Sequence, residues 1–348
     1  MSENQPPMAP PSLPPNVTLL HLITGRWISQ MIYAAAKLGI ADLLTDGGKS
    51  VEQLAETTQT HPRSLFRLLR SLAAVGVFTE SKPHFFELTP LASCLRSDAP
   101  DSMRAMAIMF GEDFHYRAWG NILHSIRTGE TAMKLTHGKE FFDFLLDHAE
   151  IASLFDQAMT SVSTLAIHAV TSAYDFTSIG TLVDIGGGHG SLLTTVLKAN
   201  PHLKGILFDQ PFVVEHAKNL VAEAGLNDRC TRVGGNFFES VPSGGDAYMM
   251  KYIIHDWDDQ PATTILKNIH QAMNPAGKLL VVETLVAPGD EPCLAKLLDM
   301  EMLVMSSGRE RTVEEYAALF EASGFKLNRV IPTQSPMSIL EAVQASKN

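Results

Sequence analysis

The chain has few cysteines, an excess of acidic over basic residues and no long apolar run. Its three cysteines, Cys94, Cys230 and Cys293, are scattered and form no Cys-x-x-Cys pair, which excludes a disulfide framework and a cysteine-rich zinc site. The net charge of −11 argues against a nucleic-acid partner. No apolar run has the length of a membrane span, and the N-terminus lacks the pattern of a secretory signal. We expect a globular, cytoplasmic protein that binds neither nucleic acid nor membrane.

The pattern changes three times along the 348 residues and predicts four segments. Residues 1–15 hold six prolines and predict a disordered or extended tail. Residues 16–100 predict helices followed by a hairpin, which is the winged-helix arrangement, and Ser50 with Gln53 predicts a capping box. Residues 101–176 predict a helical linker whose Met and aromatic side chains suit a pocket for a planar apolar ligand.

The winged helix has two possible uses. Its last helix carries Arg63, Arg67 and Arg70 on one face, which could contact DNA or could simply face solvent. The segment Ser81-Lys-Pro-His84, in the position of the wing, is only mildly basic, and the whole chain is acidic. We therefore favour a dimerisation and substrate-lid domain over a DNA-binding domain.

Residues 177–348 alternate strands and helices, a pattern that predicts a doubly wound parallel sheet. The expected parallel strands are 181–185, 205–208, 230–233, 246–254 and 278–283, and the expected helices are 191–199, 213–224, 260–273 and 313–323. Two consecutive strands at 325–330 and 337–343 predict an antiparallel pair at the sheet edge.

The stretch Thr181-Leu-Val-Asp-Ile-Gly-Gly-Gly-His-Gly190 joins the first of these strands to a helix through a glycine turn. Its spacing lacks the third glycine of a dinucleotide site, and no Gly-Lys-Ser/Thr follows. Asp184 before the turn would repel a pyrophosphate and suits a cationic or hydroxyl-rich ligand. We interpret His189 as filling a variable position of the turn.

Polar and aromatic residues follow the next strands at the edge where ligands of such sheets bind. Asp209 ends the second strand at the place where an acid binds a ribose diol. Asn236 and Phe237 follow the third strand, where an amide could bond a purine edge and a phenyl ring could pack on its face.

The fourth strand contains Met250-Lys-Tyr-Ile-Ile-His-Asp-Trp-Asp-Asp259, and alternation predicts Lys251 and His255 on one side of it. Glu283 ends the fifth strand, and Glu310 precedes the last helix. A histidine flanked by two carboxylates is suited to act as a general base, because the carboxylates fix its tautomer and stabilise its imidazolium. The acids Asp256, Asp258 and Asp259 are expected to cap the following helix.

These motifs together resemble the S-adenosylmethionine-dependent O-methyltransferases of the caffeate, acetylserotonin and hydroxyindole type. The resemblance rests on residues 183–190, Phe208-Asp-Gln-Pro211, Gly234-Gly-Asn-Phe237, residues 251–256 and Gly308-Arg-Glu-Arg-Thr312, and it covers nearly the whole chain. It implies a Rossmann-like methyltransferase domain at 177–348, metal-independent chemistry, and a homodimer formed through the N-terminal domain.

The resemblance also implies roles for individual residues. It implies a cofactor site that contains Asp184, Gly186, Gly188, Asp209, Gln210, Asn236, Phe237 and Lys251. It implies His255 as catalytic base with Glu283 and Glu310 beside it, and an acceptor pocket near Phe155, Met159, Met302 and Ser306. Asn236 departs from the acid that the family usually has at this position, but an amide oxygen can still accept from the adenine amino group, so we expect cofactor binding that is retained although weaker.

The resulting hypothesis is methyl transfer to a phenolic or enolic hydroxyl of a small aromatic or polyketide-type secondary metabolite. Transfer to nitrogen or carbon on the same fold is an alternative, although His255 with its two carboxylates favours oxygen. An alternative of another class is a catalytically inactive winged-helix regulator that senses a small molecule.

Overall fold

The computed structural model describes residues 13–345, apart from the side chains of residues 162–166. The chain divides into two compact units, one ending at Glu112 and one beginning at Asp113. Within the described residues, no helix combines the length and the hydropathy that a membrane crossing requires.

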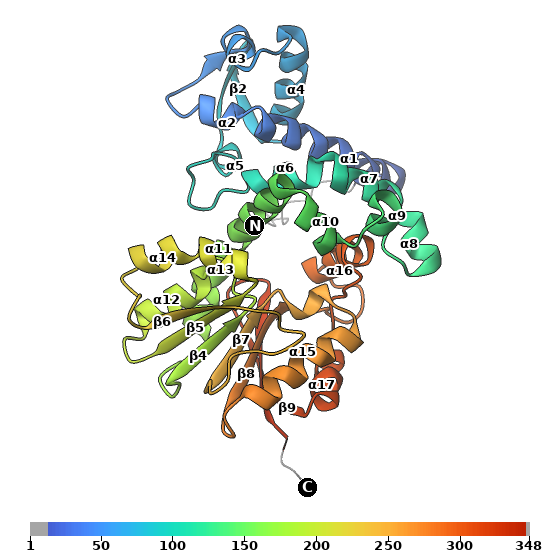
Figure 1. Ribbon diagram of the computed structural model, residues 1–348. Helices are drawn as coiled ribbons and strands as arrows, with labels where there is room; N and C mark the ends of the chain where they lie inside the picture. The colour runs from blue at the N-terminus through green and yellow to red at the C-terminus, as the bar shows by residue number, and fades with distance from the viewer. Residues whose placement is uncertain (1–12, 346–348) are drawn as a thin grey trace, which may run out of the picture. The chain divides into compact units, whose positions relative to one another are not determined.

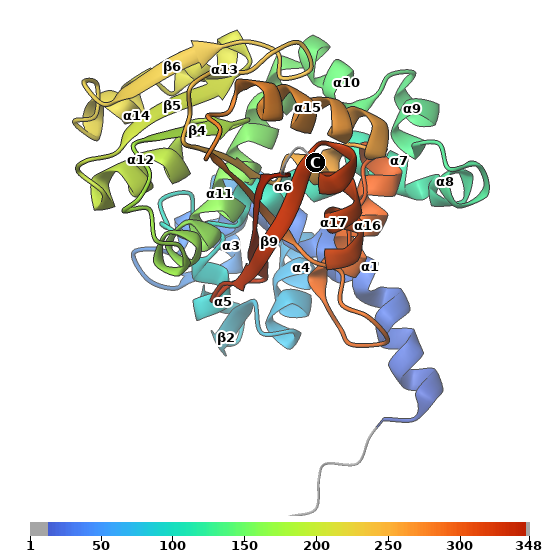
Figure 2. The ribbon, with the colours of Figure 1, turned by 90° about the horizontal axis from the view of Figure 1, so that it is seen from below.

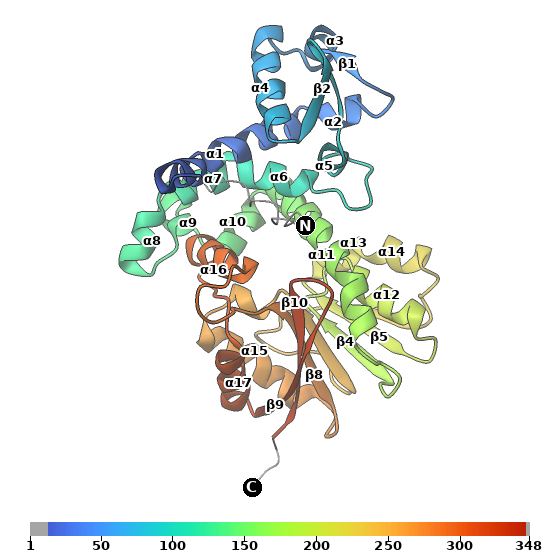
Figure 3. The ribbon, with the colours of Figure 1, turned by 180° about the vertical axis from the view of Figure 1, so that it is seen from behind.

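The described residues of the first unit form six helices and a small antiparallel sheet in the order β1–β3–β2, and Figure 3 shows α4 beside this sheet. Its elements are α1 (Pro15–Lys37), α2 (Ile40–Leu43), β1 (Lys49–Ser50), α3 (Val51–Thr58), α4 (Pro62–Ala74), β2 (Phe78–Lys82), β3 (Phe85–Leu88), α5 (Pro90–Ser93) and α6 (Arg104–Gly111). The expected capping box is present, because Ser50 accepts from the Gln53 amide and Gln53 accepts from the Ser50 amide.

Helix α4 is amphipathic in the way that its sequence predicts. Leu65, Leu69 and Leu72 are buried, whereas the three arginines of the expected basic face, Arg63, Arg67 and Arg70, are exposed. Most of the expected proline-rich tail lies outside the described residues. Helix α1 begins at Pro15, one residue inside that tail, since proline fits the first turn of a helix, where its missing N–H has no helical partner.

The second unit contains most of the chain's helices and the large sheet. Its elements are α7 (Asp113–Gly120), α8 (Ile122–Thr128), α9 (Ala132–His137), α10 (Phe141–Asp147), α11 (Ala149–Ala173), β4 (Thr181–Ile185), α12 (Ser191–Ala199), β5 (Lys204–Asp209), α13 (Pro211–His216), α14 (Lys218–Glu223), β6 (Cys230–Gly234), β7 (Ala247–Lys251), the 3₁₀ turn η1 (Ile254–Asp256), α15 (Asp259–Ala272), β8 (Lys278–Thr284), α16 (Leu294–Met305), α17 (Val313–Ala322), β9 (Phe325–Pro332) and β10 (Met337–Gln344).

Seven strands form one sheet in the order β6–β5–β4–β7–β8–β10–β9, which can be followed in Figure 1 and from below in Figure 2. The first five in this order are parallel, and β10 runs antiparallel to both β8 and β9. The predicted antiparallel pair at the edge is therefore confirmed. The strand order reverses between β4 and β7, and ligands of such sheets bind at this switch point.

Helices cover both faces of the sheet, because successive strand residues point to opposite sides. On β4, Leu182 packs with residues of α11, α12, α13 and α14, whereas Val183 and Ile185 pack with residues of α15 and α17. Figure 3 shows the first of these layers from behind, with α11 and α12 over β4 and β5.

Two predicted elements differ from the structure. The fourth strand stops at Lys251, because Tyr252 has a positive φ of 54° and the chain then turns into η1. His255 is therefore not a strand residue, and strand alternation does not place it beside Lys251. The expected helix 213–224 is two helices, α13 and α14, which are separated at Ala217.

Candidate active site

The glycine loop leaves the carboxyl end of β4 and leads into α12. Gly186, Gly188 and Gly190 have φ angles of +65°, +57° and +81°, which favour glycine at all three positions. A Cβ at Gly186 would collide with Ile253, whereas one at Gly188 would meet no atom within 4 Å. The loop at Gly188 is therefore open to a ligand that approaches the backbone closely.

Asp209 at the end of β5 is held beside this loop by backbone groups. One carboxylate oxygen accepts from the Gly188 amide at 2.8 Å, and the other accepts from the Gln210 amide at 2.7 Å. Burial raises the pKa of Asp209, and these two hydrogen bonds lower it. Each oxygen keeps lone-pair capacity for a further donor, as a ribose diol requires. Gln210 itself is exposed and supplies only its amide here.

Asp184 lies beneath the glycine loop. It is 2% exposed, and its Oδ2 has no hydrogen-bond partner within the part of the chain that the structure describes. Burial raises the pKa of Asp184 to about 7, against the lowering effect of Lys251. Burial also lowers the pKa of Lys251, while the charges of Asp184, Glu283 and Asp256 raise it. Lys251 therefore links the acids of the glycine loop to the acids around His255.

Asn236 and Phe237 lie in the turn after β6. The amide oxygen of Asn236 accepts from the Phe238 amide at 3.0 Å, and its nitrogen donates to Glu239 at 3.2 Å. The ring of Phe237 makes edge contacts with Phe238 and Trp257. The Asn236 side chain therefore already stabilises its own turn.

Glu283 holds the backbone that carries His255. Its Oε1 accepts from the amides of Ile253, Ile254 and His255 at 3.1, 3.1 and 3.4 Å. Its Oε2 is buried, lies 3.9 Å from His255 Nδ1 and has no hydrogen-bond partner within the described residues. Glu283 thus fixes the η1 turn directly and influences the imidazole through its charge.

Glu310 makes the direct hydrogen bond to the imidazole. His255 Nδ1 and Glu310 Oε1 are 2.6 Å apart, and the other oxygen of Glu310 accepts from the Thr284 hydroxyl at 2.8 Å. The Glu310 amide donates to Asp299 on α16. These contacts favour the Nδ1–H form of a neutral His255, which leaves Nε2 free to accept a proton.

The charges around His255 determine its protonation in the ligand-free site. Burial alone would lower the pKa of His255, but Glu283, Asp256 and Glu310 together raise it to about 10. Burial raises the pKa of Glu283 to about 7, against the lowering effect of His255. In the ligand-free site the surrounding carboxylates therefore favour the imidazolium form of His255.

Asp256 is a member of this cluster that the sequence analysis assigned elsewhere. Its Oδ1 lies 3.6 Å from His255 Nε2, and burial raises its pKa to about 6. Of the three acids that were expected to cap α15, Asp258 does so, because its side chain accepts from the Asp259 amide. Asp259 itself forms an ion pair with the buried Arg311. The only sequence signal for this role was that Asp256 directly follows His255. Which way its side chain points depends on the turn η1, which the sequence did not predict.

The expected acceptor-pocket residues lie on α11 and at the end of α16. The ring of Phe155 contacts Phe141 and Phe142, and Phe142 stacks on Trp257 at a centroid distance of 5.6 Å. Met302 lies one helical turn before Ser306, whose hydroxyl contacts the Met302 sulfur at 3.4 Å. Phe155, Met159 and Met302 are half-buried and Ser306 is buried. The structure thus brings Phe155 into one aromatic group with Trp257, which follows the His255 turn.

Comparison with known proteins identifies the family. Residues 119–326 match the O-methyltransferase domain, and residues 20–98 match the O-methyltransferase dimerisation domain. The chain belongs to the O-methyltransferase family. This family assignment agrees with the resemblance seen in the sequence motifs.

Relatives of known structure or activity span almost the whole chain. The phenazine O-methyltransferase PhzM of Lysobacter antibioticus is 48% identical over 95% of this chain and 97% of its own. The crystal structure of LaPhzM matches with a TM-score of 0.92 and 48% identity, covering 95% of this chain and 100% of that one. NcsB1 from neocarzinostatin biosynthesis, solved with S-adenosylmethionine and 2-hydroxy-5-methyl naphthoic acid, matches with a TM-score of 0.79 and 30% identity, covering 91% and 95%.

The chain is thus an S-adenosylmethionine-dependent O-methyltransferase, and its own residues fit this cofactor. The Rossmann-like class predicted from the sequence is confirmed. The open backbone at Gly188, the oriented carboxylate of Asp209 and the unpartnered oxygen of Asp184 suit a ligand that carries a ribose and a positive charge.

Proposed function

We propose that the chain methylates a hydroxyl group of a planar aromatic secondary metabolite, with His255 as general base. The observation that carries this proposal is the 2.6 Å contact between His255 Nδ1 and Glu310, which aims the opposite nitrogen away from the buried carboxylate. In this proposal Glu310 and Glu283 are positioning residues that act through His255.

The chemistry requires a base because a phenol has a pKa near ~10 and is mostly protonated at neutral pH. The cofactor supplies a methyl group made electrophilic by its sulfonium. Nε2 of His255 takes the hydroxyl proton as the oxygen attacks, an effect of roughly 10²–10⁴-fold in such sites. The positive charge of a bound cofactor favours the neutral form of His255, which the ligand-free cluster disfavours.

The aromatic residues and the relatives support the proposed acceptor class. Phe141, Phe142, Phe155 and Trp257 present flat apolar surfaces within the second unit. The relative from Lysobacter antibioticus acts on phenazines. We propose a hydroxylated phenazine or a similarly fused aromatic ring as acceptor, bound near Phe155, Met159, Met302 and Ser306.

We also propose a homodimer that forms through the first unit. The match to the dimerisation domain supports it, as does an apolar stripe along α1. Leu19, Leu22, Ile23 and Trp27 are 57, 74, 65 and 68% exposed in the single chain, and a second copy would cover them. Light scattering should give twice the mass of the chain, and a monomer would contradict the proposal.

Transfer to a ring nitrogen is the second candidate. It is favoured by the raised pKa of His255, because an aromatic nitrogen with a free lone pair needs no base. Transfer to oxygen and transfer to nitrogen can be distinguished by comparing acceptors that differ only in the presence of the hydroxyl group.

The test is incubation of the chain with methyl-labelled cofactor and pairs of fused aromatic compounds that differ only in the hydroxyl. Mass spectrometry should find one added methyl group on the oxygen of the hydroxylated member. Methylation of the hydroxyl-free member at nitrogen would instead support the second candidate.

A further inference from the structure

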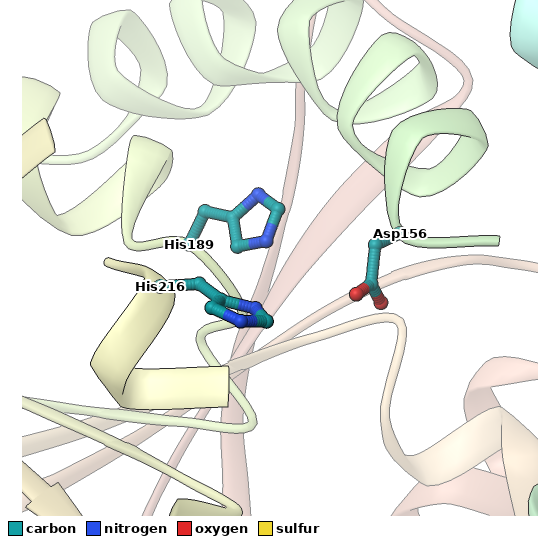
Figure 4. Close-up of side chains that lie close together, drawn as sticks. All are labelled: Asp156, His189 and His216. Atoms are coloured by element: carbon teal, nitrogen blue, oxygen red, sulfur yellow. The ribbon is translucent and has the colours of Figure 1, made fainter. Parts of the chain in front are cut away.

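Three metal-binding side chains from separate segments converge beside the glycine loop (Figure 4). Asp156 lies on α11, His189 lies within the glycine loop, and His216 is the last residue of α13. One ligand atom from each lies within 4.8 Å of the other two. Asp156 and His189 also lie close enough to Asp209 to act on its pKa, which Asp156 raises and His189 lowers.

The three side chains interact with one another. The two imidazole rings are 6.4 Å apart between centroids, and in Figure 4 the Asp156 carboxylate points toward them. Burial raises the pKa of Asp156, and both imidazoles oppose this change.

We propose that Asp156, His189 and His216 bind a divalent transition-metal ion, and that Zn²⁺ matches the site best. Two imidazoles and one carboxylate are typical Zn²⁺ ligands, whereas Mg²⁺ and Ca²⁺ prefer oxygen alone. Tetrahedral Zn²⁺ places its ligand atoms about 3.4 Å apart, so small side-chain rotations suffice. His216 is exposed and the other two are half-buried, which leaves room for these rotations.

A second group with the same donor types, His255, Glu283 and Glu310, also lies within 4.8 Å. There two of the ligand atoms are already used, because His255 Nδ1 and Glu310 Oε1 bond to each other, and Glu283 is held through its other oxygen, Oε1, by three backbone amides. A metal ion would have to break these hydrogen bonds. We therefore place the ion at the Asp156 group and outside the methyl-transfer reaction.

The position of the site gives it a consequence for the cofactor. A bound ion would connect the glycine loop to α11 and α13, and α13 begins two residues after Asp209. Because coupling between two binding sites is reciprocal, the metal ion and the cofactor would change each other's affinity.

The experiment titrates the purified full-length chain with Co²⁺ and follows its visible absorption. We expect one Co²⁺ per chain and displacement by Zn²⁺. His216→Gln should weaken binding at least about 100-fold, beyond the 10–100-fold typical of outer-sphere partners. Zn²⁺ should also raise the melting temperature of the unsubstituted chain but not of the variant.

Two controls keep the test specific. His202→Gln removes an exposed histidine elsewhere, and Glu310→Gln alters the other group, so both should bind Co²⁺ as the unsubstituted chain does. Asp156→Asn provides a second ligand variant if His216→Gln does not fold. Absent binding, equal binding by the ligand variants, or loss of binding in Glu310→Gln would overturn the proposal.

Discussion

Two groups of buried or half-buried carboxylates lie at the same sheet edge, and their negative charge is balanced in different ways. Asp184 and Asp209 flank the glycine loop, where Lys251 offsets only part of the cost of burying Asp184. Glu283, Glu310 and Asp256 surround His255, whose pKa they raise to about 10. The group of Asp184 and Asp209 is therefore suited to bind a positively charged ligand. The group around His255 already contains a side chain that can carry the positive charge. The first group should therefore govern cofactor affinity, and the second should govern proton transfer.

The largest expected effect comes from removing the internal cation. His255→Ala should lower kcat by roughly 10²–10⁴-fold, because no group remains to take the hydroxyl proton. Cofactor affinity should change little, as measured by calorimetry on the same preparation. His202→Ala is the matched control and should keep full turnover. A His255→Ala enzyme with near-normal kcat would end the assignment of His255 as base.

The complementary change removes a charge from the glycine-loop group. Asp209→Asn should weaken cofactor binding by about 10- to 150-fold. This range corresponds to the free energy of about 1.5–3 kcal/mol that a charge-assisted hydrogen bond contributes. At saturating cofactor, kcat should stay within a few-fold of the unsubstituted value. If kcat falls while affinity holds, the division of labour between the two groups is wrong.

A smaller effect concerns the pH dependence of the His255 group. Activity requires neutral His255, so it rises with pH through the pKa of the imidazole. Glu310→Gln removes a charge that raises this pKa, so the rise should move to lower pH by about one pH unit or more. The measurement is kcat/KM against pH for both forms. A rise that stays at the same pH or moves upward would show that Glu310 does not act through His255.

The smallest effect is expected at Asn236. Asn236→Asp restores the acid that the family has at this position and should tighten cofactor binding by about tenfold or less, since the new charge lies on an exposed turn. Calorimetry with S-adenosylmethionine measures it directly. The neighbouring Glu239 is a like charge, and weaker binding by the variant would mean that its repulsion outweighs the new hydrogen bond.

The sequence predicted the sheet because its signals are local. The apolar strand 181–185 and the glycine turn after it need no distant partner to be recognised. The β8 partner of β7 and the edge pair β9–β10 followed from chain order and short connections.

The arrangement around His255 was harder to predict from the sequence because it depends on one backbone angle. The positive φ of Tyr252 ends β7 early. Three backbone amides then donate to Glu283, and no residue pattern in the sequence predicts these hydrogen bonds. Asp256 consequently faces the imidazole instead of capping α15. The convergence of Asp156 with His189 and His216 was hidden for a similar reason, since α11 and α13 meet the loop only in the folded chain.

The central claim is that His255 takes the proton of the acceptor. Its most direct test is the rate of a single turnover against pH, for the unsubstituted enzyme and for His255→Ala, with cofactor and a hydroxylated fused aromatic bound. We predict an ionisation in the unsubstituted enzyme that disappears in the variant, whose slower rate then follows only the ionisation of the acceptor hydroxyl. Two profiles of the same shape and similar rate would contradict the account.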